Sequence, residues 1–356
     1  MELIFIIIVL FHTGIKNVEC HGNMVLPTVW WDKERIGMGK GHQCWSGFSI
    51  DDLPAGKGAG TNCFWFTNDT FIPHSATLDN SLRTYRNVEI FPGYGPLDYT
   101  KNNPWRSPGS AHVHSPCGNA GGNPNGCPIG APRNEGFDCP GGGWSHGPNA
   151  ENYPFEDVPI TEWSIGSVVE VGWGIIANHG GGYSYRLCKL PKDGVAHLTE
   201  RCFQQTPLDF VGNVQWAQYG LDRETRIEFV ANRTRKGTYP PGSQWTKNPI
   251  PACYPYGGFN SKVCDELQFP EPAPGLSGFG VLIKDPKNAL FKFNIIDKVQ
   301  IPFELEPGEY VLSFRWDCEQ TPQIWNGCAT IKLVDKSQER QVNTLNKQFK
   351  ELYQLP

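Results

Sequence analysis

The chain has few charged residues and no basic excess. Only 19% of its 356 residues are charged, and Asp and Glu outnumber Lys and Arg by 36 to 31. Domains that bind nucleic acid usually carry a basic face, which this balance does not supply. After residue 20, no apolar run is long enough to cross a membrane. We therefore expect neither nucleic acid nor a membrane among the partners.

Glycine and proline are abundant instead, with 40 and 30 residues. This share lies well above the average for globular proteins and below the range of disordered chains. The 12 Trp and 20 Phe supply ample material for a hydrophobic core. The composition therefore indicates a β-rich protein with many loops.

Alternation of apolar and polar residues, the pattern of half-buried strands, becomes clear only after residue 160. Residues 21–160 are dense in Gly, Pro, Asn and Cys, which indicates long loops pinned by disulfides. We expect one domain over 21–334, an all-β, immunoglobulin- or fibronectin III-like antiparallel β-sandwich, and a polar tail over 335–356. The predicted strands cover residues 167–175, 183–190, 226–230, 290–295, 310–316 and 329–334.

The first residues have the features of a signal peptide. The apolar run from Leu3 to Phe11 is too short to span a bilayer but has the length of a signal-peptide core. Modest side chains at Val18 and Cys20 favour cleavage between Cys20 and His21. We therefore predict that residues 1–20 are removed and that the mature protein, secreted and extracellular, begins at His21.

The 12 cysteines of an exported chain indicate disulfides, although spacing alone does not establish which cysteines pair. Removal of Cys20 leaves an odd number, with Cys139 unmatched when neighbours in the sequence are joined. The sequons that begin at Asn68 and Asn232 predict two glycosylation sites. The predicted local pairs are Cys44–Cys63, Cys117–Cys127, Cys188–Cys202, Cys253–Cys264 and Cys318–Cys328.

A histidine at a free N-terminus, as His21 would be, can chelate one metal ion through its α-amine and a ring nitrogen. The α-amine has a pKa of about 7.7–8, so it loses its proton readily near neutrality. A third nitrogen from a distant histidine would complete a planar set that favours Cu(II). His179, in a glycine-rich segment between two predicted strands, is one candidate. The alternative is His112 with His114, whose i,i+2 spacing puts both imidazoles on one face and suits Zn or Cu. The remaining histidines beyond residue 20 stand in polar loops and are expected at the surface: His42, His74, His146 and His197.

Four stretches, in order along the chain, carry a family resemblance. They are His21-Gly22-Asn23-Met24-Val25-Leu26-Pro27, Ser115-Pro116-Cys117-Gly118 with Gly121-Gly122-Asn123-Pro124, residues 177–188 around His179, and Gln323-Ile324-Trp325-Asn326-Gly327-Cys328-Ala329-Thr330-Ile331. Together they resemble the lytic polysaccharide monooxygenases, specifically the arthropod-type group (auxiliary activity family fifteen) and its chitin-binding type-4 relatives. The resemblance spans residues 21 to about 334.

The resemblance implies a histidine brace, in which His21 and His179 hold one copper ion. Gln323 would contact the oxidant, and Trp325 aligns with the axial position, where the family usually has Tyr or Phe; alternatively, Trp325 is an ordinary core tryptophan. An external electron donor and O₂ or H₂O₂ would serve as cosubstrates. The implied reaction is oxidative cleavage of glycosidic bonds in an insoluble polysaccharide, chitin first and cellulose second, by a monomeric enzyme.

Two other interpretations stay open. The first is a non-catalytic extracellular chitin-binding or structural protein, because Trp325 and Thr330 both depart from the residues usual in the enzymes. The second is a zinc-binding module that uses His112 and His114.

Overall fold

The computed structural model describes residues 21–30, 65–73, 102–120, 122, 127–128, 145–146, 148–153, 155, 158–219, 222–252, 269–277 and 293–336. The predicted signal peptide, Cys139, the pairs Cys44–Cys63 and Cys253–Cys264, and the tail beyond residue 336 lie outside these residues. Within them the chain is built almost entirely of strands, which confirms the predicted all-β class.

The strands are β1 (His21–Leu26), β2 (Trp65–Thr67), β3 (Asn119–Ala120), β4 (Cys127–Pro128), β5 (Ser145–His146), β6 (Ile160–Ser164), β7 (Val168–Ala177), β8 (Gly182–Lys189), β9 (Val214–Gln218), β10 (Ile227–Val230), β11 (Arg233–Thr234), β12 (Trp245–Lys247), β13 (Asn294–Gln300), β14 (Gly308–Asp317) and β15 (Ile324–Val334). The helices are α1 (Glu200–Gln205) and the short 3-10 helices Pro104–Arg106, Ala150–Asn152, Val195–His197 and Arg223–Thr225.

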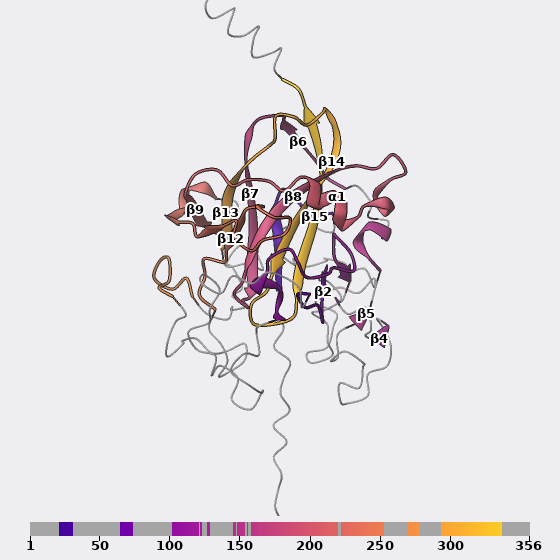
Figure 1. Cartoon of the computed structure of the whole chain (residues 1–356). Coiled ribbons are helices and arrows are strands. Elements are labelled where there is room, and N and C mark those ends of the chain that lie inside the picture. The colour runs from indigo at the N-terminus through magenta and orange to yellow at the C-terminus, as the bar shows by residue number, and fades with distance from the viewer. Residues whose placement is uncertain are drawn as a thin grey trace, which may run out of the picture.

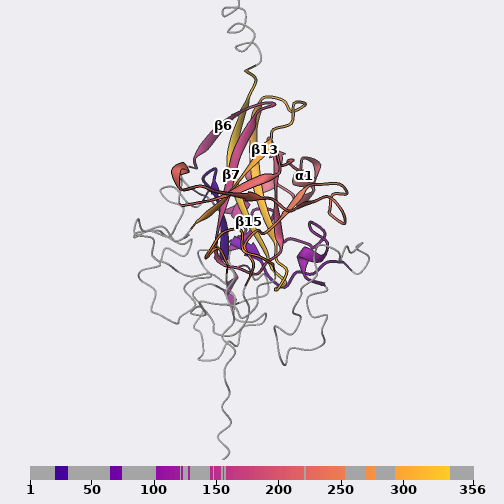
Figure 2. The ribbon, with the colours of Figure 1, turned by 90° about the vertical axis from the view of Figure 1, so that its left-hand side faces the viewer.

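Two sheets pack face to face as a β-sandwich (Figures 1 and 2). The five-stranded sheet has the order β1-β7-β13-β9-β10. The eight-stranded sheet has the order β11-β12-β8-β14-β15-β2-β3, and β6 joins it by pairing with β15 in parallel. All other pairs within these two sheets are antiparallel, so the predicted antiparallel sandwich is confirmed.

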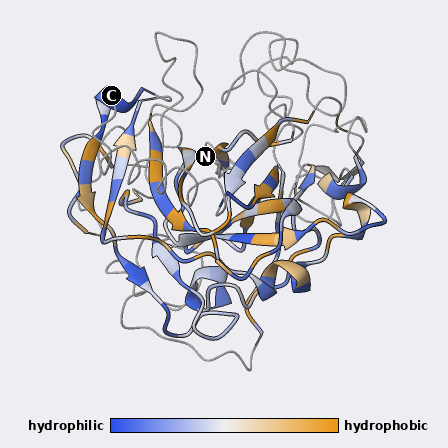
Figure 3. Ribbon diagram, turned by 90° about the horizontal axis from the view of Figure 1, so that it is seen from above, coloured by the Kyte–Doolittle hydropathy of each residue, from blue (hydrophilic) through white to orange (hydrophobic). Residues whose placement is uncertain are grey.

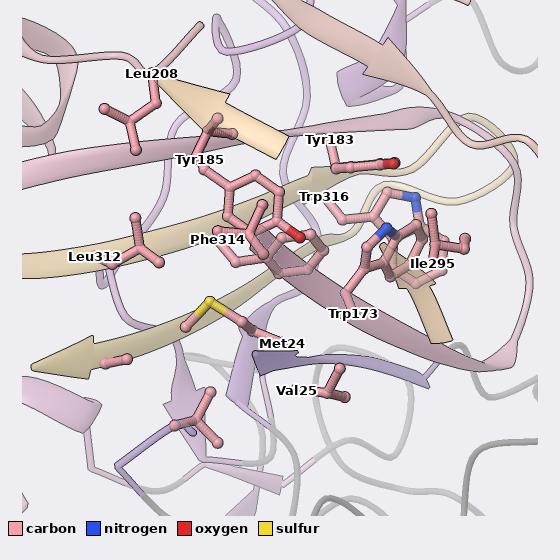
Figure 4. Packing of buried hydrophobic residues seen from close by; sticks show 14 of the residues in the cluster. Met24, Val25, Trp173, Tyr183, Tyr185, Leu208, Ile295, Leu312, Phe314 and Trp316 are labelled. Atoms are coloured by element: carbon pink, nitrogen blue, oxygen red, sulfur yellow. The ribbon is translucent and has the colours of Figure 1, made fainter. Parts of the chain in front are cut away.

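The core lies between the two sheets. Successive side chains of a strand point to opposite faces, so every second residue of β8 and β14 points inward. Tyr185, Phe314 and Trp316 pack there against Trp173 of β7 and Met24 of β1 (Figure 4). Figure 3 shows both hydrophobic and hydrophilic residues along the strands. Full burial of a side chain such as Phe314 or Met24 contributes about 1.5–3 kcal/mol to stability.

The outer face of the eight-stranded sheet is polar, although it is also buried. Arg315 of β14 is fully buried and binds Asp317 through Nε, with 2.6 Å to Oδ1, and Glu200 of α1 through Nη1, with 2.8 Å to Oε1. Arg186 of β8 forms a second ion pair with the same Glu200 oxygen. Buried charges are stable only when they are paired, so α1 is held on this face by the two guanidinium groups.

Among the described residues, two disulfides link the segments that cover this outer face to the sheet. Cys188 of β8 joins Cys202 of α1, which confirms one predicted pair. Cys117 joins Cys328 of β15 across 211 residues, so the predicted pairs Cys117–Cys127 and Cys318–Cys328 are wrong. Cys328 faces Ser313 in the β14–β15 register, whereas Cys318 follows the far end of β14. Proximity in the sequence therefore did not predict the partner of Cys328, because the β14–β15 hairpin places Cys318 and Cys328 at different positions along the sheet.

Most predicted strands correspond to observed ones, namely β7, β8, β10, β14 and β15. The strand predicted over 290–295 instead begins at Asn294 and continues to Gln300. Residues 21–160, predicted as long loops pinned by disulfides, also contain the strands β1 to β5. The sequence pattern did not predict β1. Its pairing with β7 contains two register shifts, which interrupt the alternation on which the prediction depended.

No helix in the described ranges has the length and apolar character to cross a membrane.

Candidate metal centre

The main chain of His21 lies beside the segment that carries His179. In the antiparallel pair of β1 and β7, His21 is the partner of Ala177, the last residue of β7. His179 follows two residues later, in the connection to β8. The structure therefore places the main chain of His21 next to the end of β7, two residues before His179, although the two histidines are 158 positions apart in the sequence.

Two glycines shape the connection that carries His179. Gly180 and Gly181 have φ angles of 63° and 80°, in the left-handed region that favours glycine. A Cβ on Gly181 would lie 2.0 Å from the carbonyl oxygen of Asp317, so no other residue fits there. The carbonyl of His179 accepts hydrogen bonds from the backbone N–H groups of Glu319 and Gln320, at 3.2 and 3.1 Å. The His179 backbone is thus fixed to the segment that follows β14.

A buried asparagine pair holds the same connection from its other side. The Asn178 side-chain oxygen accepts from the Gly180 N–H at 2.9 Å and from Asn248 Nδ2 at 2.8 Å. Asn178 Nδ2 donates to the carbonyl of Ile250 at 2.9 Å. Both asparagines are almost completely buried. A buried amide network of this kind is costly to break, and it fixes the loop in one conformation.

Trp316 of β14 connects the start of β1 to the His179 loop. Its indole Nε1 donates to the carbonyl of Gly180 at 2.8 Å. A Cβ on Gly22 would lie 2.7 Å from Cζ3 of the same ring. Glycine after His21 therefore lets β1 lie directly on the indole. Sequence reasoning placed Trp316 in the predicted strand over 310–316 but did not single it out.

The His179 side chain is completely buried. Burial lowers its pKa to about 3, because the charged imidazolium is poorly solvated in the protein interior. The imidazole is therefore neutral near pH 7, the form in which a ring nitrogen can bind a metal.

The donor types fit copper. An imidazole from His179, with an imidazole and an α-amine from His21 once residues 1–20 are removed, would make an all-nitrogen set of the kind that suits Cu(II). Among the residues that the structure describes, no three His, Cys, Asp or Glu side chains gather as a possible metal cluster. A two-histidine brace would not form such a cluster, because its third ligand is the amine.

Gln323 and Trp325 lie at the start of β15, close to each other. Trp325 is fully buried and stacks on Phe66, with ring centroids 4.2 Å apart and an angle of 7° between the planes. Its Nε1 donates to Gln323 Oε1 at 3.4 Å. Trp325 is also the cross-strand partner of Trp316, which contacts the His179 loop. Trp325 is thus part of the core, and its proposed axial role stays a prediction.

His112 and His114 form a separate pair. Both side chains are exposed, with ring centroids 5.3 Å apart, while Val113 between them is buried. Val113 packs in a small cluster with Ile72 and Ile324. The predicted i,i+2 geometry is therefore present, in a different cluster from the residues that surround Trp316.

The two predicted glycosylation sites differ in exposure. Asn232 is exposed, as an N-linked glycan requires, whereas Asn68 is only 6% exposed. Glycosylation at both sites stays a prediction, which the burial of Asn68 disfavours.

Comparison with known proteins finds distant similarities, with lytic polysaccharide monooxygenases among them. No protein-family model matches the chain. A curated relative, the AA13 family lytic polysaccharide monooxygenase A of Pyricularia oryzae, is 24% identical over 192 residues, which cover 49% of this chain and 43% of the relative. The chain thus spans less than half the length of this relative.

Similar solved structures include a lytic polysaccharide monooxygenase AA15 from Thermobia domestica in the Cu(I) state, at 13% identity and a TM-score of 0.25, covering 50% of this chain and 65% of that one. A chitin binding domain from Burkholderia pseudomallei matches at 13% identity and a TM-score of 0.24, covering 49% and 57%. The comparisons thus find lytic polysaccharide monooxygenases among the proteins similar to this chain, as its four sequence motifs suggested.

Proposed function

We propose that the chain is a secreted, copper-dependent lytic polysaccharide monooxygenase that oxidatively cleaves glycosidic bonds in chitin, with cellulose as the second candidate. The observation that carries the proposal is the β1–β7 register, which places His21 beside the segment of His179. The close approach of Gly22 to Trp316 supports it, because this contact explains why the histidine is followed by glycine. The catalytic domain covers residues 21–334, after a signal peptide over 1–20 and before a tail over 335–356, and acts as a monomer.

The metal ligands are His21, through its α-amine and imidazole, and His179, through its imidazole. Copper, when bound, supplies one-electron redox chemistry, with an external electron donor and O₂ or H₂O₂ as cosubstrates. The protein's part is to present three nitrogens at fixed positions. The backbone hydrogen bonds of His179 and the buried Asn178–Asn248 pair supply this rigidity.

Other residues of the chain shape the surroundings. Trp316 closes the inner side of the site and keeps water out, since its fully buried ring lies between Gly22 and the Gly180 carbonyl. Gln323 would contact the oxidant, and Trp325 would shield the site without acting as a ligand, because an indole N–H is only a donor.

One observation favours a second candidate, an extracellular chitin-binding protein without catalytic activity. Trp325 is fully buried in a stack with Phe66, as expected for a structural core residue. A protein of this kind could retain the sandwich and the copper ligands without turnover.

The test uses protein whose N-terminus is His21. We expect a type-2 Cu(II) signal in electron paramagnetic resonance, and oxidised oligosaccharides after incubation with chitin and ascorbate. The matched control carries one additional alanine before His21, which leaves the fold unchanged and removes the amine chelate. It should lose both the signal and the products. A parallel incubation with cellulose tests the second substrate.

Two outcomes decide against parts of the proposal. Unchanged copper affinity in the extended protein or in His179→Ala would overturn the brace. Tight copper binding that depends on both ligands, without oxidised products from either polysaccharide, would favour the non-catalytic binding protein. His197→Ala serves as a control for His179→Ala, because His197 is an exposed histidine in a separate 3-10 helix.

A further inference from the structure

His112 and His114 present two imidazoles to solvent, on either side of the buried Val113. Residues i and i+2 of an extended chain point the same way, and the intervening Val113 is buried at 6% exposure. The two rings lie with centroids 5.3 Å apart and planes at 74° to each other. Both residues are exposed, so a solvated metal ion can reach them.

The backbone that carries this pair is held firmly in place. The carbonyl of Ala111 accepts a hydrogen bond of 2.9 Å from Nη2 of the fully buried Arg315. The carbonyl of His112 accepts a hydrogen bond from the hydroxyl of Thr70. Val113 packs against Ile72 and Ile324. Because the backbone is already fixed, metal binding restricts only the rotation of the two histidine side chains. This lowers the entropic cost of forming a site.

The guanidinium that holds Ala111 is itself fixed. Arg315 binds Asp317 at 2.6 Å through Nε and Glu200 at 2.8 Å through Nη1. Asp317 also accepts a hydrogen bond of 2.8 Å from the backbone N–H of Gly109. The segment that leads to His112 is thus anchored at two backbone positions by a single buried ion pair.

The spacing of the two rings suits a tetrahedral metal ion. With a metal–nitrogen bond of about 2.1 Å, two imidazoles on one tetrahedral ion have ring centres about 5 Å apart. A right angle between the two metal–nitrogen bonds would instead place the ring centres about 4.5 Å apart. The observed centroid separation of 5.3 Å is compatible with two imidazoles on one tetrahedral ion, the usual arrangement for Zn²⁺ in proteins.

We propose that His112 and His114 form a zinc site on the surface, with one ring nitrogen from each histidine as ligands and water in the other positions. Imidazole is a favoured ligand of Zn²⁺. The ligands of this site differ from those of the His21–His179 centre, and the inference does not depend on the proposed function. Because two protein ligands leave positions open, bound zinc exchanges with solvent and with added chelators.

The test is a calorimetric titration of the mature, full chain with Zn²⁺, in which the stoichiometry and affinity of wild type are compared with those of His112→Ala and His114→Ala. Each variant should lose one equivalent of zinc or bind it about tenfold more weakly or worse, because one of two ligands is gone. The matched control is His197→Ala, which should bind zinc as wild type does. The extended protein, with alanine before His21, should retain this site, and that result separates it from the brace.

Long-range proton–nitrogen NMR spectra supply a second readout. Zinc should shift one ring nitrogen of His112 and one of His114 together, at the same zinc equivalent. Unaltered zinc stoichiometry and affinity in both variants would overturn the proposal. Loss of zinc in one variant only would also overturn it, because the site requires both rings. Circular dichroism confirms that the variants are folded, as expected for substitutions at exposed side chains.

Discussion

At the scale of single residues, Gly22 shows most clearly how one position supports the candidate site. A methyl group at Gly22 would lie 2.7 Å from the Trp316 ring, well inside van der Waals contact. We expect Gly22→Ala to lower the free energy of unfolding by about 1–3 kcal/mol, because overpacking forces β1 away from the indole. Urea denaturation measures this change.

Gly327→Ala is a suitable comparison for that variant. Gly327 also lies on a core-facing strand position, but its Cβ would meet its nearest neighbour at 3.3 Å. We expect Gly327→Ala to lower the free energy of unfolding less than Gly22→Ala does. Equal losses in the two variants would show that the contact with Trp316 is not the cause. The double variant Gly22→Ala/Trp316→Phe should show coupling between the two positions, since they touch.

Asp297 is a second residue whose surroundings have a measurable consequence. Its carboxylate is fully buried between the sheets, where it accepts a hydrogen bond of 2.5 Å from the Tyr183 hydroxyl. Arg233 lies 3.4 Å away. Burial raises the pKa of Asp297 to about 6, and the Tyr183 hydrogen bond and the Arg233 charge offset only part of this effect.

The raised pKa predicts a pH dependence of stability. The folded protein holds the Asp297 proton up to about pH 6, whereas the unfolded chain loses it near pH 4. The stabilisation that comes from tighter binding of the Asp297 proton in the folded state is therefore present below about pH 4. It is lost as the pH rises through about 6. Relative to that of Asp297→Asn, the free energy of unfolding of wild type should fall by about 2–3 kcal/mol between pH 4 and pH 7. Urea denaturation of both proteins across this range tests it, and a constant difference would contradict the assignment.

At the scale of elements, the two described disulfides stabilise the outer layer to different extents. Cys117–Cys328 joins residues 211 apart, and Cys188–Cys202 joins residues 14 apart. The chain-entropy model gives a stabilisation of about 5 kcal/mol for the longer loop and about 3 kcal/mol for the shorter one. Cys117 and Cys328 are also both completely buried.

We therefore predict that Cys117→Ala/Cys328→Ala destabilises the protein more than Cys188→Ala/Cys202→Ala does. Chemical denaturation under non-reducing conditions measures the order. The reverse order would mean that attachment of α1 to β8, rather than loop closure, dominates the stability of this layer.

The strands were predictable where their surroundings are regular. β8 and β14 lie in the middle of the larger sheet, so strict alternation separates their core-facing residues from their outward residues. β1 has shifted pairing, and β9 carries Gln215 and Gln218 as buried polar residues. These strands give a weaker signal because hydrogen bonding and tertiary packing override the simple pattern.

At the scale of the whole molecule, copper binding should be coupled to stability. A ligand that binds only the folded state stabilises it by about 2.7 kcal/mol at a concentration of 100 Kd. For a protein of this size we expect Cu²⁺ to raise the Tm of the mature chain by about 5 °C. The protein with alanine before His21 should show a much smaller rise. Differential scanning calorimetry measures both, and equal shifts would speak against the amine as a ligand.

The sequence by itself determined the all-β class, the region of clear strands, and the importance of the glycine-rich segment around His179. These properties are local, since alternation has a period of two residues and glycine is favoured where the backbone is left-handed. It also singled out His21 and the pair His112 and His114 from residue types and spacing alone.

Only the tertiary structure decided which distant residues meet. The β1–β7 register places His21 beside the His179 segment, and the packing of Trp316 makes glycine necessary at position 22. The pairing of Cys117 with Cys328 was likewise settled by the sheet. Each of these contacts joins residues more than a hundred positions apart, so no local pattern specifies them. They follow from how two sheets bury their inner faces together, which is a property of the whole chain.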